Sequence, residues 1–486
     1  MNGLAPVLNV LATIMVGFSL MFLVPLGWAL SLDHSDLHGV WATGMALTLG
    51  AGLLILVLTR HHKRELLPRD GFLLVNLVWI VLPLFSAIPL MLAMERLSFT
   101  DAYFEAMSAL TATGATVLSG LDDLPVSVNV WRCFLQLIGG LGIMLLVVAV
   151  LPLLGLGGVQ LYKAETPGPM KDARLTPRIA ETARGLWGVY FAFSAACMLA
   201  YRWVGMSWPD AFMHMCTTMG LGGFSSHDAS FGYWPDKNVE LVAIVFMALA
   251  GISFARYFIV WRGRSLGPLL RDAEVRTYAL VLLASAVGLT AVLMLHGTYD
   301  VLSEAALSAA FHVVSVATTT GYAATDYAMW PVFAPVWLMF LGTFVSCAGS
   351  TGGGIKMVRM VVLVKQARRE MVRAIHPRVV NPVTMGRTTI PSTVIAVVMA
   401  YMLIYGATTL GLTMLMLLSG LDIVTAFSAV VATVNNIGPG LGQVGPSTNF
   451  SILSDFQTWV GTLGMLMGRL EFIAVFVLFA PEFWRK

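Results

Sequence analysis

The sequence predicts an all-α polytopic membrane protein with ten transmembrane helices. Four units, each a span, a re-entrant pore loop and a second span, are predicted to surround one axis with pseudo-fourfold symmetry. Three observations indicate this fold: the composition, a series of charge-free runs, and a glycine-centred pattern that occurs four times. Of the 486 residues, 58% are hydrophobic and only 11% are charged, whereas a soluble domain carries about a quarter charged residues.

The charge-free runs supply the transmembrane helices, since a helix needs about 17 to 25 apolar residues to cross a bilayer. The first run lacks the basic start of a signal peptide, so we expect it to be a span. The run at 241–255 is slightly short and must extend past a flanking charge. The last run contains Arg469 and Glu471. The ten candidate spans are residues 1–32, 40–59, 71–94, 133–162, 185–201, 241–255, 277–299, 327–355, 388–421 and 456–481.

The repeated pattern appears when the chain is aligned on Gly114, Gly223, Gly321 and Gly438, which lie about a hundred residues apart. Upstream of each glycine, at a constant distance, is a residue type that favours helix N-caps, followed by alanine. We expect each copy to form a cap, a helix of about 12 residues and an extended segment that re-enters the membrane without crossing it. The four predicted caps are Asp101, Asp210, Ser308 and Thr425.

The repeats divide the chain into two leading transmembrane helices and four pore units. Most of the 29 basic residues fall in connections on one side of the predicted membrane and in the C-terminal tail. By the positive-inside rule these connections, and both termini, are cytoplasmic, and the glycine segments enter from outside. The units are residues 1–68 for the leading helices and 69–165, 166–265, 266–375 and 376–486 for the pore repeats; the basic connections are 60–69, 163–184, 262–276 and 356–387.

Four such segments around one axis can form a selectivity filter. A dehydrated monovalent cation needs oxygen ligands in place of its water shell, and rings of backbone carbonyls provide them. Glycine allows the unusual dihedral angles that this backbone requires. A short helix that points its C-terminus at the pore adds partial negative charge, which favours cations. The alternative is that the four segments are tight turns between helices.

The segments resemble the four filter segments of the Trk/Ktr/HKT superfamily, and the two leading helices with a glycine-rich break in the eighth span resemble its TrkH/TrkG branch. The resemblance implies potassium uptake across the bacterial inner membrane by a homodimer with one pore per chain. It also implies a cytosolic nucleotide-binding regulatory subunit of the TrkA type. Potassium is the implied bound ion, without an organic cofactor. The implied filter residues are Ala112, Thr113, Gly114, Leu221, Gly222, Gly223, Thr319, Thr320, Gly321, Asn436, Ile437 and Gly438.

Two details depart from the family pattern. Ala112 replaces a threonine that is common at its position in the family. In the second copy Gly220, Gly222 and Gly223 all compete for the filter position, and the sequence leaves the choice open.

A second glycine-rich stretch interrupts the run at 327–355. Glycine costs about 1 kcal/mol relative to alanine in a helix, so this stretch predicts a break. It is not a phosphate loop, because Lys356 is one position late and no strand precedes it. A kink for close packing is one interpretation; the resemblance implies a flexible intramembrane gate loop below the filter. The residues concerned are Gly349, Ser350, Thr351, Gly352, Gly353 and Gly354.

Arg469 lies inside the last run, and an intramembrane charge usually faces the protein interior or a water-filled path. Either it forms a structural ion pair with another span or, as the resemblance implies, it projects under the filter. Glu471 is predicted on the opposite side of the same helix. Arg256 is predicted to be an anchor near a cytoplasmic end. His214 and His312, in re-entrant helices, are predicted to be structural.

Other function classes find little support. An intramembrane enzyme would need a convergent acid/base or nucleophile set, whereas the spans are nearly free of Asp, Glu and Lys. Four scattered cysteines favour packing over disulfides or metal binding. Nothing indicates nucleic-acid binding, and membrane lipids are expected around the spans. The alternative to potassium uptake by conduction is a sodium-permeable or ion-coupled potassium symporter.

Overall fold

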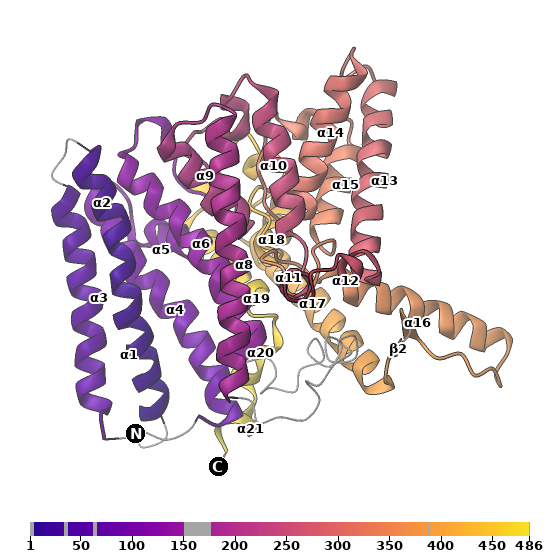
Figure 1. Ribbon diagram of the computed structural model, residues 1–486, viewed down its shortest axis with the longest axis horizontal. Coiled ribbons are helices and arrows are strands. Elements are labelled where there is room, and N and C mark those ends of the chain that lie inside the picture. The colour runs from indigo at the N-terminus through magenta and orange to yellow at the C-terminus, as the bar shows by residue number, and fades with distance from the viewer. Residues whose placement is uncertain (1–3, 34–36, 62–65, 150–175, 387, 486) are drawn as a thin grey trace.

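The computed structural model describes residues 4–33, 37–61, 66–149, 176–386 and 388–485. The predicted basic connection at 163–184 falls largely outside the described residues. Nearly all regular structure in the described residues is helical, as expected, with one two-stranded hairpin. Both ends of the chain lie at the same end of the molecule, and α16 projects sideways from the helical body (Figure 1).

The long helices follow the predicted spans closely over the first half of the chain. They are α1 (Ala5–Ser19) continued through η1 (Leu20–Phe22) into α2 (Leu23–Ser31), α3 (Leu37–Thr59), α4 (Pro68–Ala93), α6 (Val126–Ala149), α8 (Thr176–Trp203), α13 (Ala273–Leu295) and α17 (Ser392–Leu418). In the described residues these seven elements are long and apolar enough to cross a membrane.

The remaining predicted spans are broken. They contain α10 (Lys237–Ala250) with α11 (Phe254–Gly263), α15 (Phe333–Gly342), and α19 (Asp455–Arg469) with α20 (Ile473–Phe476). The first pair bends by 85° and the last by 106°, and counting each as one span gives nine. The run at 241–255 extends past a flanking charge, as predicted, because α10 begins at Lys237 and includes Glu240, but the helix is broken between Ala250 and Phe254. The run at 327–355 holds only the ten-residue α15, and helix resumes at α16 (Met357–Ile375).

Four short helices precede the aligned glycines, and we call them the half-helices. They are α5 (Phe99–Leu110), α9 (Trp208–Gly220), α14 (Leu302–Ala317) and α18 (Ile423–Val434). Each packs against the helix before it in the chain and the helix after it. Each also packs against the second helix of the preceding copy: α9 on α6, α14 on α10, α18 on α15 and α5 on α19. The last contact closes the series into a cycle.

The predicted caps are wrong by three residues in three copies. The N-caps are Ser98, Ser207 and Asp422, and each accepts a hydrogen bond from the backbone N–H of the residue that we had predicted as the cap. The Ser98 hydroxyl in turn donates to the Asp101 carboxylate at 2.7 Å. Asp and Ser are both favoured in the first turn of a helix, so the sequence pattern identified the first turn correctly but not the N-cap residue. The third half-helix begins at Leu302, six residues before Ser308, and has no side-chain cap.

The remaining elements are small. They are α12 (Gly267–Leu270), α21 (Pro481–Trp484) and the strands β1 (Thr384–Met385) and β2 (Thr388–Thr389), which pair antiparallel. Short 3-10 turns follow the half-helices at Leu121–Asp123, Ser230–Tyr233, Tyr327–Met329, Gly442–Val444 and Phe450–Ile452.

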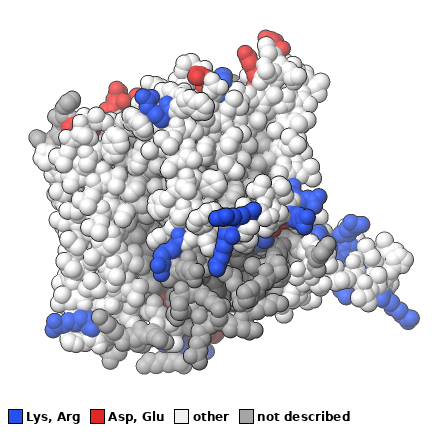
Figure 2. Space-filling view, in the orientation of Figure 1, with Lys and Arg blue, Asp and Glu red and all other residues white. Residues whose placement is uncertain are grey.

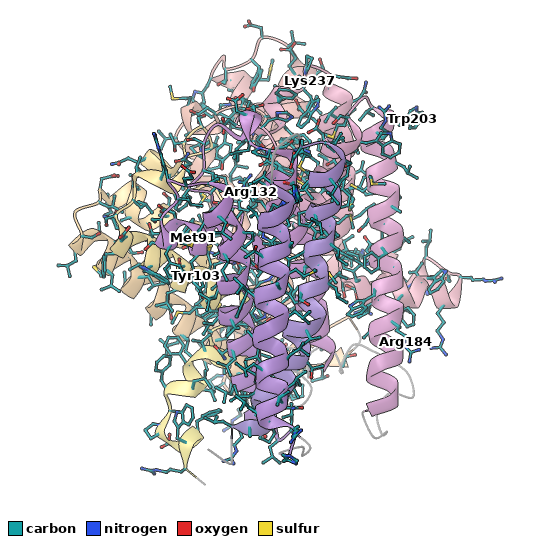
Figure 3. The ribbon with its side chains drawn as sticks, turned by 90° about the vertical axis from the view of Figure 1, so that its left-hand side faces the viewer. Met91, Tyr103, Arg132, Arg184, Trp203 and Lys237 are labelled. Carbon is teal, nitrogen blue, oxygen red and sulfur yellow. The ribbon has the colours of Figure 1, made fainter. Side chains whose placement is uncertain are left out.

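The surface is that of a membrane protein. Asp and Glu gather at the end of the molecule away from the termini, with a few Lys and Arg beside them, and a broad uncharged band lies between this end and further Lys and Arg (Figure 2). Lys237 and Arg184 lie near opposite ends of the molecule (Figure 3). Large apolar side chains on the long helices are exposed, such as Leu283 at 65% and Leu403 at 75%, which is expected where lipid covers them. All four cysteines are buried and free, as predicted.

Candidate functional site

After each half-helix the backbone makes the same turn. The residue two positions before each aligned glycine has positive φ: Ala112 at 50°, Leu221 at 53°, Thr319 at 65° and Asn436 at 54°. The glycine itself follows at 83°, 76°, 84° and 101° for Gly114, Gly223, Gly321 and Gly438. Positive φ is uncommon for non-glycine residues, and here it recurs at the same place four times. Gly223 therefore has the conformation of the other three glycines, and Gly220 is the last residue of α9.

One backbone hydrogen bond accompanies each turn. The residue before the glycine donates its N–H to a carbonyl five positions back, near the end of the half-helix. This arrangement satisfies carbonyls that a helix C-terminus would otherwise leave free. The four bonds are Thr113 to Ser108 at 2.8 Å, Gly222 to Thr217 at 2.9 Å, Thr320 to Ser315 at 2.8 Å and Ile437 to Ala432 at 2.8 Å.

The four glycines lie against one another's segments in a closed order. A Cβ on Gly114 would lie 2.0 Å from the carbonyl oxygen of Gly222, the residue before the next glycine. The same relation joins Gly223 to Thr320 at 1.9 Å, Gly321 to Ile437 at 2.0 Å and Gly438 to Thr113 at 2.9 Å. The first three distances exclude any side chain, since the obstacle is backbone. The structure thus brings all twelve predicted filter residues together in four adjoining turns, which we call the ring.

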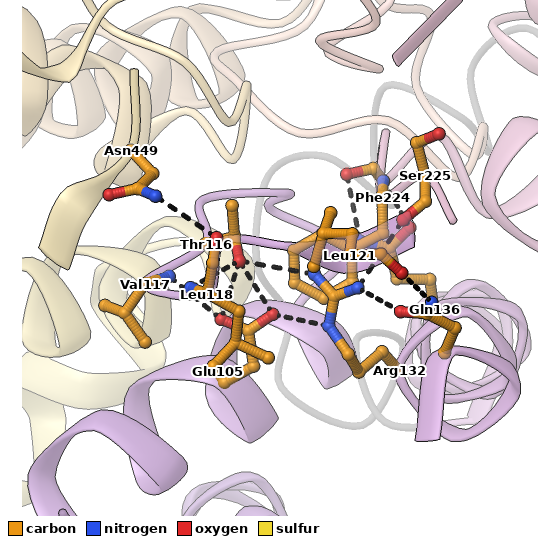
Figure 4. A network of polar contacts seen from close by, with 12 residues as sticks. Glu105, Thr116, Val117, Leu118, Leu121, Arg132, Gln136, Phe224, Ser225 and Asn449 are labelled. Atoms are coloured by element: carbon orange, nitrogen blue, oxygen red, sulfur yellow. Dashed lines mark hydrogen bonds and ion pairs between the residues drawn. The ribbon is translucent and has the colours of Figure 1, made fainter. Parts of the chain in front are cut away.

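Polar side chains of α5 and α6 form hydrogen bonds with the first two ring segments (Figure 4). Gln136 on α6 donates to the Gly222 carbonyl at 2.9 Å and accepts the Phe224 N–H at 3.2 Å. Arg132, one turn earlier, forms a buried ion pair with Glu105 of α5 at 2.8 Å, and its guanidinium lies 4.5 Å from the centre of the Phe224 ring. A buried ion pair needs further hydrogen bonds to offset its desolvation.

The pair obtains these bonds from the residues after Gly114 and from Asn129 of α6. The Glu105 carboxylate accepts from the Thr116 hydroxyl and the Val117 N–H, each at 3.0 Å. Arg132 donates to Asn129 Oδ1 at 2.9 Å. The sequence analysis missed this pair. The available signal was a carboxylate in the middle of a half-helix, but its partner lies 27 positions away on another helix, where no helical spacing relates the two.

The two histidines of the half-helices are structural, as predicted. His214 Nδ1 donates to the Asp210 carbonyl at 2.8 Å, and His214 Nε2 lies 3.0 Å from the Ser225 hydroxyl. His312 Nδ1 donates to the Ser308 carbonyl at 2.8 Å, and Nε2 accepts the Ala324 N–H at 3.2 Å. Within the described ranges, no group of three or more His, Cys, Asp and Glu side chains could hold a metal ion.

The predicted gate residues belong to a longer non-helical stretch, residues 343–356, which we call the intramembrane segment. It contacts the C-terminal ends of three half-helices. Thr351 Oγ1 donates to the Met219 carbonyl at 2.9 Å, and the Gly353 N–H donates to Thr319 Oγ1 at 2.8 Å. A Cβ on Gly353 would lie 2.1 Å from the Asn435 carbonyl oxygen. The segment therefore lies directly against the ring, on the side of the half-helix C-termini.

Arg469 ends α19 and is 2% exposed. Its guanidinium donates to the carbonyl oxygens of Thr351 at 2.9 Å and Gly139 at 3.0 Å. One Arg469 side chain thus joins the intramembrane segment to α6. Carbonyl oxygens are its hydrogen-bond partners in the described residues, which disfavours the alternative of a structural ion pair.

Two neighbouring predictions need correction. Glu471 does not lie on the opposite side of a continuing helix, because the helix ends at Arg469 and Glu471 has φ of 59°. Glu471 instead forms an ion pair with Arg359 of α16. Arg256 is not a free anchor at the membrane surface: it pairs with Asp272 at 2.6 Å, and both side chains are largely buried.

Comparisons with known proteins agree with this geometry. The TrkH family model, described as a cation transport protein, matches residues 38–486. The "Trk system potassium uptake protein TrkH" of Halomonas elongata is 42% identical over the full length of both chains. Its namesake in Escherichia coli K12 is 42% identical over 88% of each chain. The crystal structure of the potassium transporter TrkH from Vibrio parahaemolyticus superposes with a TM-score of 0.92, at 37% identity over 99% of each chain.

Proposed function

The chain belongs to the TrkH family of cation transport proteins, and from this premise we propose that it takes up potassium across the bacterial inner membrane. The observation that carries the proposal is the ring. Four backbone turns with positive φ at the same two positions adjoin one another in closed order, and each presents a carbonyl beside the glycine of the preceding copy. Potassium would exchange its water shell for such carbonyl oxygens.

The half-helices add to the stabilisation of a cation. Their C-terminal ends meet the ring, and a helix C-terminus carries partial negative charge. The positive charge of Arg132, whose guanidinium lies beside Phe224, is paired with the Glu105 carboxylate. The filter would therefore consist of backbone oxygens and helix dipoles, with the predicted filter residues in the four turns. Gly223 is the second-copy residue that we assign to the ring position.

We further propose the complete topology of ten spans and four pore repeats. The three broken second helices, α10–α11, α15 and α19–α20, each occupy the position that the straight α6 holds in the first repeat. The closed packing cycle of the half-helices supports pseudo-fourfold symmetry, with domain limits as predicted from the sequence. The basic end of the molecule, which holds both termini, would face the cytoplasm (Figure 2).

The intramembrane segment and Arg469 would gate the pathway. The segment contacts the ring from the side of the basic end, so an ion leaving the ring inward would meet it first. Arg469 adds a positive charge there and holds Thr351 in place. The proposal includes a homodimer with one pore per chain and regulation by a cytosolic TrkA-type subunit. The basic, projecting α16 follows the segment directly and is suited to transmit such regulation.

A reconstituted rubidium uptake assay tests the proposal. Purified protein in liposomes should carry rubidium inward, and potassium should compete more strongly than sodium. Equal competition by sodium would favour the alternative of a sodium-permeable transporter. Uptake that requires a proton or sodium gradient, in place of a membrane potential, would favour a symporter. No uptake by protein that elutes as a single species from size exclusion would contradict the proposal.

A further inference from the structure

The position nine residues before each ring glycine has a shared structural role. It holds Glu105, His214, His312 and Ala429 in the four copies. The first three are fully buried, and each forms a hydrogen bond with the non-helical segment that follows its own glycine. We propose that Glu105, His214 and His312 are positioning residues that determine how strictly the ring discriminates between cations. They do not contact the ion, and the inference rests on the proposed function.

The shared contact is a hydrogen bond to the third residue after the glycine. The Val117 N–H donates to Glu105 Oε2 at 3.0 Å, and the Ala324 N–H donates to His312 Nε2 at 3.2 Å. In the fourth copy Ala429 cannot accept a bond, and the neighbouring Ser428 does so. Its hydroxyl accepts the Leu441 N–H at 2.8 Å. Three unrelated side chains therefore satisfy the same backbone group, which would otherwise be buried without a partner.

In the second copy His214 contacts the segment after Gly223 through the Ser225 hydroxyl. His214 Nε2 lies 3.0 Å from Ser225 Oγ, and Ser225 is the second residue after Gly223. Ser225 Oγ also accepts the His227 N–H at 3.1 Å. In every copy, side-chain hydrogen bonds thus join the half-helix to the segment after the glycine, although the residue types differ.

The hydrogen bonds define the protonation of both ring nitrogens of His312 and of the Nδ1 of His214. Each Nδ1 faces a backbone carbonyl, which can only accept, so Nδ1 carries the proton. His312 Nε2 accepts an N–H and therefore holds no proton. The position of His312 requires a neutral imidazole with one donor and one acceptor nitrogen. A leucine of similar size supplies neither. A glutamine places an amide oxygen close to where Nε2 lies and can accept the same bond.

These bonds matter for selectivity because they fix the backbone on the far side of each ring glycine. The turn is held on one side by the half-helix, through the bond from the residue before the glycine. It is held on the other side by the positioning residue. Without the second bond the carbonyls can spread, and the ring can then adapt to a smaller or more hydrated cation. Selectivity depends on the size and rigidity of such a ring or on the field of its carbonyls, and both change when the carbonyls move.

The test compares His312→Leu with His312→Gln in the full-length protein in liposomes, measuring the ratio of potassium to sodium as competitors of rubidium uptake. We expect His312→Leu to reduce the ratio about fivefold, the equilibrium factor for one neutral hydrogen bond. His312→Gln should restore most of it. His296→Leu is the matched control, because His296 is exposed at the end of α13. It should keep the parent ratio.

Ser428→Ala is the second variant, because it removes the equivalent bond with a much smaller change in volume. Ser428→Ala should also lower the ratio of potassium to sodium competition. If His312→Leu fails to fold, the result for Ser428→Ala alone tests the proposal. Parent ratios in a well-folded Ser428→Ala protein, or in His312→Leu, would overturn the inference while leaving the proposed function intact. A parent protein without any preference for potassium would instead contradict the proposed function.

Discussion

The ring and the intramembrane segment are both glycine-rich and lie in contact, yet they are held in different ways. Every ring turn has the same dihedral angles, the same backbone hydrogen bond and a neighbour on each side. The intramembrane segment has no repeat of its own. It meets the ring through the bond from the Gly353 N–H to Thr319 Oγ1, contacts α9 through Thr351, and is joined to α6 by the guanidinium of Arg469.

The difference shows which part can move. The ring is constrained by four equivalent sets of bonds, so one disturbed turn still has an intact neighbour on each side. The segment is held by different contacts that are each made once, such as Ser346 Oγ to the Thr318 carbonyl and the Ala348 N–H to the Glu274 carboxylate. We therefore expect changes in the ring to alter which ion passes, and changes in the segment to alter how much passes. The predictions that follow test this division.

The largest effect is expected from removing the charge of Arg469. At an effective dielectric constant near 20, two unit charges about 6 Å apart repel by roughly 3 kcal/mol, or about two orders of magnitude in rate if the repulsion lies wholly in the exit barrier. Arg469→Ala should therefore increase rubidium flux by up to about a hundredfold. Arg469→Lys should keep part of the barrier. Normal elution together with flux at or below that of the parent would exclude Arg469 as the barrier.

The ring should show the next largest effect, and it should be on selectivity. Gly321→Ser places a Cβ against the Ile437 carbonyl and strains a turn at φ of 84°. A cost of about 1 to 2 kcal/mol in the ring corresponds to roughly a tenfold loss of preference for potassium over sodium. Gly297→Ser is the matched control, since Gly297 also has positive φ but open space around its Cβ position. Unchanged ion competition in Gly321→Ser would remove Gly321 from the filter.

Deleting residues 349–354 should increase flux about fivefold without changing ion competition. The estimate corresponds to a barrier lowered by ~1 kcal/mol, because Arg469 remains in place. The interpretation as a packing kink gives a different result: the deleted protein would lose stability and conduct no more than the parent. A change in selectivity would mean that the ring and the segment are not separable.

The smallest effect concerns a histidine beyond the ring. His227, outside the predicted spans, lies between Asp122 and Asp210 and stacks on Tyr233. Burial lowers the pKa of His227, but hydrogen bonds and attraction from the two carboxylates outweigh burial and raise it above 6.5. The stabilisation is therefore complete below pH 6.5 and lost as pH rises through the higher folded-state pKa.

Thermal unfolding in detergent measures this effect. The parent should lose about 1 to 2 °C between pH 6 and pH 9 relative to His227→Gln. His296→Gln, at an exposed site, should follow the parent. Equal pH profiles for the parent and His227→Gln would contradict a charged His227.

The sequence predicted the ring because its signals are local. A glycine, a short apolar helix and a first turn rich in Ser and Asp recur at one spacing, and each is set by neighbours in the chain. The cap was displaced by three residues because Ser98 and Asp101 both suit that turn. The breaks in the later spans were harder to predict. The bend before Phe254 accompanies a bond from its N–H to Gly349, nearly a hundred residues away.

The positioning residues were missed for the same reason. His214 and His312 were recognised as structural, but the segments that they contact could not be identified without the fold. Glu105 looked like a single charge in a half-helix until Arg132 was placed beside it. Local spacing predicts turns and helices well, whereas partners brought together from different copies require the three-dimensional arrangement.

The most direct test of the central claim is anomalous diffraction from crystals soaked in rubidium. The account predicts an anomalous peak on the axis of the ring, close to the carbonyl oxygens of Thr113, Gly222, Thr320 and Ile437. Potassium added in excess should remove the peak, and sodium at the same concentration should not. A ring without a peak, in crystals that show ordered rubidium elsewhere on the protein, would contradict the claim that these four turns bind the transported ion.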